Sequence, residues 1–155
     1  MISDVPEYLK SPELIPVLSV YKVLGCEFKY SDCKRRKYAA GLIDRYGNLV
    51  KITTNKPFAC KNGCDRIIKN IPHGTRYEEC SSIHAEQALF VEANGFPFNG
   101  YSMVLRGYDM EINDEIEAIP CKICARIILH SGIDWLYTSE RRYDARELCY
   151  DIIMR

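Results

Sequence analysis

The sequence lacks an excess of charge of either sign. Its 155 residues include 21 lysines and arginines and 21 aspartates and glutamates, so the formal net charge is zero. A neutral chain has no overall field that would attract nucleic acid or an anionic membrane surface. The balance therefore argues against a polynucleotide partner, although a local basic patch is compatible with it.

Long apolar runs and a targeting pattern are also missing. No apolar run approaches the roughly 18 residues that a membrane span needs. The first 25 residues carry early acids and three prolines. They show no basic stretch followed by an apolar one, which is the pattern of a signal peptide. We therefore expect a cytoplasmic protein that is not bound to a membrane.

The chain contains no internal repeat, low-complexity tract or flexible linker, so we expect a single domain over residues 1–155. Hydrophobic residues make up 47% of the chain, an ordinary value for a globular protein with one buried core. Ser81 or Ser82 is expected to cap a helix that stops at Gly95.

The hydrophobic pattern predicts alternating strands and helices. Residues 39–44 and 49–54 are strand-like and flank a turn that contains Gly47, which indicates a β-hairpin. A hairpin followed by strand–helix units predicts an α/β fold with helices packed on a mixed sheet. The other expected elements are helices at about 13–28, 82–94, 120–131 and 143–153, strands at 101–107 and 133–139, a long loop at 55–81, and a loop or short helix at 109–117.

Eight cysteines are many for 155 residues, and in a protein expected to be cytoplasmic the CxxC spacing favours metal ligation over disulfides. Cys121 and Cys124 are three residues apart, so on a helix they share one face and can chelate one ion. His84, about 37 residues earlier, would be the third ligand. Three protein ligands leave the fourth tetrahedral position of zinc open to water, which is the catalytic arrangement.

Both ligand groups fall in the first turn of an expected helix. The positive ends of two helix dipoles would meet at the ion and favour thiolates and bound hydroxide. Zinc lowers the pKa of its water towards about 7. Glu86 would lie beside the ion but off the ligand position, which suits a residue that shuttles protons. The alternative is a structural zinc site in which Cys121 and Cys124 join two other cysteines, Cys60 and Cys64.

The order His84-Ala85-Glu86, then Pro120-Cys121-Lys122-Ile123-Cys124, matches the H-x-E…P-C-x-x-C signature of zinc-dependent nucleobase deaminases. The chain resembles the cytidine/deoxycytidylate deaminase superfamily, and within it the deoxycytidylate (dCMP) deaminase-like branch, over about residues 31–138. The further matching segments are Ser31–Arg36, Ala40–Asp44, Thr54–Pro57, Cys80, Ile83–Glu86 and Ser131–Ile133.

Three departures from that branch are visible. Ala39-Ala40 stands where the family has Val-Gly-Ala, and the Tyr and Gly that usually surround the asparagine are missing at Asn55. The connection Gly107–Ile119 is longer than the usual T-x-x-P-C connection. The first two departures concern substrate contacts, and the third concerns the mouth of the pocket or an oligomer contact.

The resemblance implies a cytidine deaminase-like three-layer α/β/α domain that converts a cytosine nucleotide, dCMP, to dUMP and ammonia with one catalytic Zn²⁺. Glu86 would be the catalytic residue. Asn55 would hold the sugar 3′-hydroxyl, and the backbone N–H of Ala85 would contact the pyrimidine carbonyl. A plain turn residue is the alternative for Asn55. Related proteins commonly assemble, so a homo-oligomer is also expected.

Two other functions are compatible with these motifs. One is deamination of a polynucleotide, either tRNA adenosine or single-stranded DNA cytosine. Balanced charge and few stacking aromatics near the motif argue against it. The other is a catalytically inactive zinc-binding regulatory module of the same fold, which the intact Glu86 argues against.

The remaining cysteines and the basic residues leave alternatives open. Cys33, Cys60, Cys64 and Cys80, with His73 nearby, are either ligands of a second, structural zinc, as the resemblance implies, or reduced thiols packed as small hydrophobes. Cys26 and Cys149 are expected in the core. The run Lys34–Lys37 is either a solvated face or a phosphate contact. Further phosphate candidates are Arg76, Arg106 and Arg141-Arg142.

Overall fold

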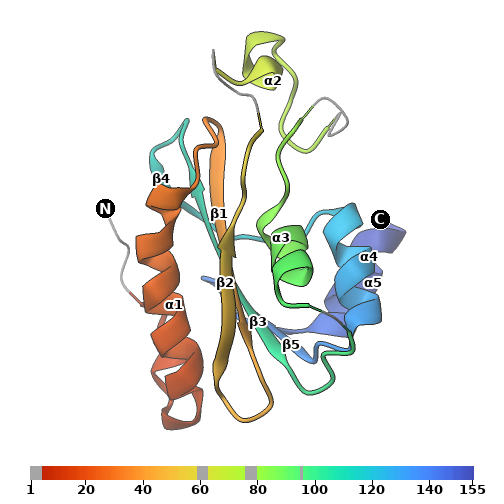
Figure 1. The fold of residues 1–155 in the computed structure, drawn as a ribbon. Coiled ribbons are helices and arrows are strands. Elements are labelled where there is room, and N and C mark those ends of the chain that lie inside the picture. Colours follow the sequence, from red (N-terminus) through yellow and green to blue (C-terminus); the bar gives the residue numbers. More distant parts are fainter. Residues whose placement is uncertain (1–4, 59–62, 76–79, 95) are drawn as a thin grey trace.

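The computed structural model describes residues 5–58, 63–75, 80–94 and 96–155. A mixed six-stranded sheet forms the middle of the molecule, with strand order β2-β1-β3-β5-β6 and β4 beside β3 (Figure 1). β3 and β5 run parallel, whereas the other pairs are antiparallel. The strands are β1 (Arg36–Ile43), β2 (Leu49–Thr54), β3 (Ser102–Asp109), β4 (Asp114–Ile116), β5 (Trp135–Tyr137) and β6 (Arg142–Asp144).

Helices cover both faces of the sheet. α1 (Ile15–Glu27) packs on one face, and α3 (Ala85–Glu92), α4 (Lys122–Ser131) and α5 (Ala145–Met154) lie on the other (Figure 1). The expected three-layer α/β/α arrangement is therefore confirmed. The short helix α2 (Asp65–Ile68) stands apart, beyond one end of the sheet. None of the described helices is long and apolar enough to cross a membrane.

Two apolar clusters hold the layers together because successive strand residues point to opposite faces. Between α1 and the sheet, Tyr21 and Leu24 pack with Val104 of β3. On the other face, Leu89 and Ile128 pack with strand residues that include Leu42, Met103 and Leu136. Each cluster buries its large side chains almost completely, so the register of the strands determines which residues reach which face.

The predicted hairpin is confirmed by the antiparallel pairing of β1 and β2. The prediction of a loop or short helix over the acidic stretch 109–117 was wrong, since β4 lies within it and pairs with residues 107–109. Pairing against an existing strand overrides the low strand propensity of acidic residues. Likewise, residues 142–144 form β6 rather than the start of a helix, and α5 begins only at Ala145.

The predicted helix starts were also shifted. His84, not Ser81 or Ser82, is the N-cap of α3, and its backbone N–H donates to Oε1 of Gln87 over 2.9 Å. α4 begins one residue after Cys121 rather than at Pro120. The expected end of α4 is confirmed, because Gly132 adopts a left-handed conformation with φ 89°. Gly95, the expected stop of α3, lies outside the described residues.

Candidate metal centre

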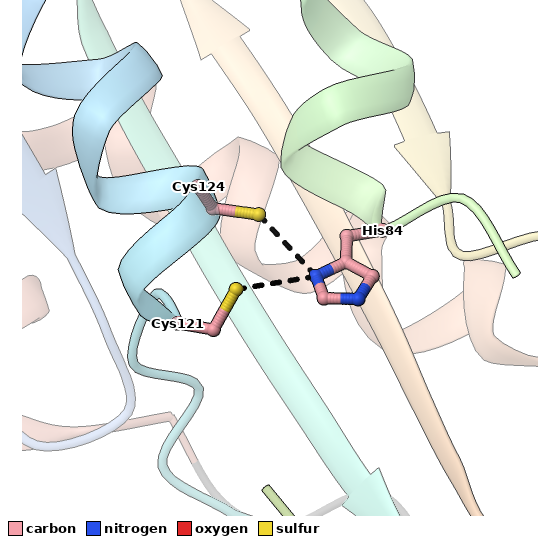
Figure 2. Close-up of side chains that lie close together, drawn as sticks. All are labelled: His84, Cys121 and Cys124. Carbon is pink, nitrogen blue, oxygen red and sulfur yellow. Dashed lines mark hydrogen bonds between the residues drawn. The ribbon is translucent and has the colours of Figure 1, made fainter. Parts of the chain in front are cut away.

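The starts of α3 and α4 bring three ligand side chains together (Figure 2). His84 Nδ1 lies 3.5 Å from Cys121 Sγ and 3.3 Å from Cys124 Sγ. All three ligand atoms lie within 4.8 Å of one another. Zinc bonds of about 2.3 Å to sulfur and about 2.0 Å to nitrogen place S and N about 3.5 Å apart in a tetrahedral site. The spacing therefore fits a zinc ion.

The backbone supports this arrangement. His84 and Cys121 are the N-caps of α3 and α4, and Cys124 is the third residue of α4. At these positions the first N–H groups of a helix have no partner within it, and the helix dipole is positive. Because the positive ends of two helix dipoles meet beside the cysteines, they stabilise the negatively charged thiolate form of these ligands. The expected placement of both ligand groups at helix starts is thus present in the structure.

The three ligands are coupled through their protons. A hydrogen bond from Cys124 lowers the pKa of Cys121 to about 4, with His84 adding to the effect. The same bond and burial raise the pKa of Cys124, and the bond with Cys121 raises the pKa of His84. Zinc binds thiolates and neutral imidazole, so its binding would displace these shared protons.

Glu86 is the second residue of α3, is buried, and lies close enough to Cys124 to hydrogen bond with it. Burial raises the pKa of its carboxyl group. A buried carboxyl beside a metal site can hold a proton and release it again, as a general acid–base group must. The four residues that the sequence motif predicts to act together are therefore brought together.

A cavity of about 170 Å³ opens beside this centre. His84, Glu86 and Cys121 line it, and three arginines, Arg35, Arg36 and Arg66, are also among the lining residues, together with His73. The structure thus joins a possible metal centre and a positively charged surface in one cavity.

The basic residues are held in place by hydrogen bonds. Arg35 Nη1 donates to the carbonyl oxygen of Ile71 over 2.6 Å, and Arg66 Nη2 donates to that of Thr75 over 2.6 Å. Arg36 Nε donates to Asp109 Oδ2 over 3.0 Å. Partial burial, followed by the charges of the three arginines, lowers the pKa of His73 to about 4. Three guanidinium groups therefore lie near a neutral His73, and two of them are in ion pairs, Arg36 with Asp109 and Arg35 with Glu111.

The run Lys34–Lys37 is consequently not just a solvated face, because Arg35 and Arg36 line the cavity. Arg106 fails as a phosphate candidate although it borders the cavity. Its guanidinium lies under α1, where it donates to the carbonyl oxygen of Tyr21 over 2.9 Å and pairs with Glu115. The remaining candidates are Arg141 and Arg142, which are exposed and do not line the cavity, and Arg76, which lies outside the described residues.

Asn55 is buried at the cavity and joins two segments. Its Oδ1 accepts from the Ser31 hydroxyl over 2.7 Å and from the Tyr38 N–H over 2.9 Å, while Nδ2 donates to the Arg36 carbonyl over 2.9 Å. It is therefore more than a plain turn residue. The expected contact of Asn55 with a sugar hydroxyl stays a prediction. Ala85 is the first residue of α3, and its expected contact with the base stays a prediction.

Among the described residues, His84, Cys121 and Cys124 are the only close group of three possible ligands. Cys33, Cys64 and Cys80 are unpaired thiols, and Cys60 lies outside the described residues. The second zinc therefore stays a prediction. Cys149 is buried as expected, whereas the prediction of a core position for Cys26 was wrong, because Cys26 is exposed.

Tyr38 also lines the cavity, although no sequence motif pointed to it. The one sequence feature that could have drawn attention to this residue is the departure of Ala39-Ala40 from the Val-Gly-Ala order of the family. Tyr38 is the residue that directly precedes Ala39-Ala40.

No protein-family model matches the chain, and no curated protein matches it. Among solved structures, the crystal structure of cytidine deaminase from Mycobacterium leprae is similar, with 13% sequence identity and a TM-score of 0.49. The match covers 83% of this chain and 92% of that chain. This similarity is too low to transfer a family or an activity, so the function rests on the site itself.

Proposed function

We propose that this chain is a zinc-dependent hydrolase that deaminates a cytosine nucleotide, with dCMP as its substrate. The observation that supports the proposal is that one cavity joins the His84, Cys121 and Cys124 ligand group, a buried carboxyl group and a basic surface. The first two suit hydrolysis at an amino-substituted ring carbon. The basic surface suits a phosphate.

The reaction exchanges the 4-amino group of cytosine for a carbonyl oxygen: water is consumed and ammonia leaves. Zinc, when bound by the three ligands, supplies a water of lowered pKa. Glu86 would hold the proton that the attacking water gives up, and would pass protons to the ring nitrogen and the departing amine. Asn55 would orient the sugar, and the N–H of Ala85 would orient the pyrimidine carbonyl.

The basic surface favours a nucleotide over a nucleoside. Arginine binds phosphate through planar, charge-assisted hydrogen bonds. Arg35, Arg36 and Arg66 all line this cavity, in a chain whose formal net charge is zero. A local concentration of positive charge in an otherwise neutral protein suits a small anionic substrate better than a long polyanion, which would need an extended basic groove.

A substrate panel tests the proposal. The zinc-loaded protein is incubated with deoxycytidine, cytidine, CMP, dCMP, dCTP and a short single-stranded oligonucleotide, and ammonia release is measured. We expect the highest kcat/KM with dCMP. Faster release from the oligonucleotide would favour the polynucleotide alternative and reject the mononucleotide. Absence of ammonia from every substrate, with zinc bound, would favour the inactive module and reject the enzyme.

A further inference from the structure

Tyr38 is the only phenol among the described residues that line the cavity. Its cross-strand partner on β3 is Gly107. A Cβ atom at Gly107 would lie 2.9 Å from Cε1 of the Tyr38 ring, and Ile116 of β4 lies beside the same position. The ring therefore packs against the bare backbone of Gly107. The backbone N–H of Tyr38 is also fixed, since it donates to Oδ1 of Asn55 over 2.9 Å.

Arg36 lies two residues before Tyr38 on β1, so both side chains point to the same face of the strand. The Arg36 guanidinium lies within hydrogen-bonding reach of the Tyr38 hydroxyl, and its Nε donates to Asp109 over 3.0 Å. A guanidinium is donor-only, so the phenolic oxygen is the acceptor in a bond between them. The phenolic proton therefore points elsewhere, and no other hydrogen bond joins this hydroxyl to a described residue.

The Tyr38 hydroxyl and the Arg36 guanidinium can therefore both donate hydrogen bonds to one anion in the cavity. The phenol that accepts from a cation can donate its own proton to an anion, and such charge-assisted bonds are about twice as strong as neutral ones. A guanidinium has five N–H donors, so the bonds to Asp109 and Tyr38 leave further donors for a ligand. The carboxylate of Asp109 accepts from Arg36 and so holds it at the cavity, but Asp109 has no hydrogen bond with the Tyr38 hydroxyl.

We infer that Tyr38 and Arg36 together bind the 5′-phosphate of a nucleoside monophosphate and so determine that the site accepts nucleotides in preference to nucleosides. This inference rests on the proposed function, since it assigns the phosphate of that substrate to two side chains. Tyr38 contributes one neutral donor, and Arg36 contributes the charge.

The test compares two product ligands that differ only in the phosphate. Binding of dUMP and of deoxyuridine to the zinc-loaded protein is measured by calorimetry, which needs no turnover. We expect the unaltered protein to bind dUMP more tightly. Tyr38→Phe keeps the ring and removes the hydroxyl, and should weaken dUMP binding about tenfold or more while deoxyuridine binding is unchanged. Arg36→Gln should weaken dUMP binding at least as much.

Tyr101→Phe is the matched control. Tyr101 is half-buried, packs on Phe98 at 5.3 Å between ring centroids and does not line the cavity, so neither affinity should change. Equal weakening of dUMP and deoxyuridine by Tyr38→Phe would overturn the inference, as would unchanged binding of both. A failure of the proposed deamination is distinguishable, because ammonia release would then be absent while the two ligands could still be compared.

Discussion

Glu86 has its proposed role because α3 begins one residue before it. This start buries the carboxyl group beside Cys124 instead of exposing it on the helix surface. We expect Glu86→Gln to lower the rate of ammonia release by about 10²–10⁴-fold, because a general acid–base group contributes that much. Zinc content should be unchanged, since Glu86 is not one of the three ligands. Activity that persists in the zinc-loaded variant would show that another group moves the proton.

For single residues, sequence spacing predicted which side chains form the metal centre, but it did not predict which arginines line the cavity. Cys121 and Cys124 share a helical turn, so three positions of separation are enough to place them together. Arg35 and Arg36 give no such local signal. Arg35 reaches the cavity because it bonds to the carbonyl of Ile71, far along the chain, and Arg36 because β1 pairs in one register.

At the scale of elements, the packing of β1 on β3 leaves no room for a side chain opposite Tyr38. A methyl group at Gly107 would lie 2.9 Å from the Tyr38 ring. We expect Gly107→Ala to lower the free energy of unfolding by about 1–3 kcal/mol, the usual cost of overpacking. In urea unfolding this cost should shrink when Tyr38→Ala is also present. An equal cost in both backgrounds would mean that the ring is not the obstacle.

A second element-scale contact anchors the segment that leads to Cys121. Glu117 accepts hydrogen bonds from the hydroxyl groups of Thr138, over 2.8 Å, and Tyr143, over 3.1 Å. These residues belong to the turn and strand after β5, so the carboxylate ties the C-terminal hairpin of the sheet to the chain just before α4.

We expect Glu117→Ala to weaken zinc binding by roughly tenfold, because outer contacts position the ligands of a metal site. Competition with a chromophoric chelator measures this affinity. Glu117→Gln keeps a hydrogen-bond acceptor and is the matched control, with a smaller effect. A loss of thermal stability without a change in zinc affinity would show that Glu117 supports the fold alone.

For the whole molecule, a zinc ion would link α3 and α4, which carry the ligands from two distant parts of the chain. Chelation should therefore lower Tm, since a ligand bound only by the native state stabilises it. Zinc affinity should rise between pH 6 and pH 8. The pKa of Cys124 is raised, so its thiol must lose a proton when zinc binds, and this loss becomes easier as pH increases. An affinity that does not vary with pH would contradict this set of ligands.

By itself, the sequence determined the residues His84, Glu86, Cys121 and Cys124 and their grouping, as well as the three-layer α/β/α architecture. The spacing of Cys121 and Cys124 and the hydrophobic periodicity of the α/β elements are local, whereas the grouping of His84 with the two cysteines and the three layers were expected from the motif and the family resemblance. Only the tertiary structure decided that Tyr38 faces the cavity and that the guanidinium of Arg106 lies beneath α1. The physical reason is that strand register and distant neighbours, rather than local pattern, choose the surroundings of a strand side chain.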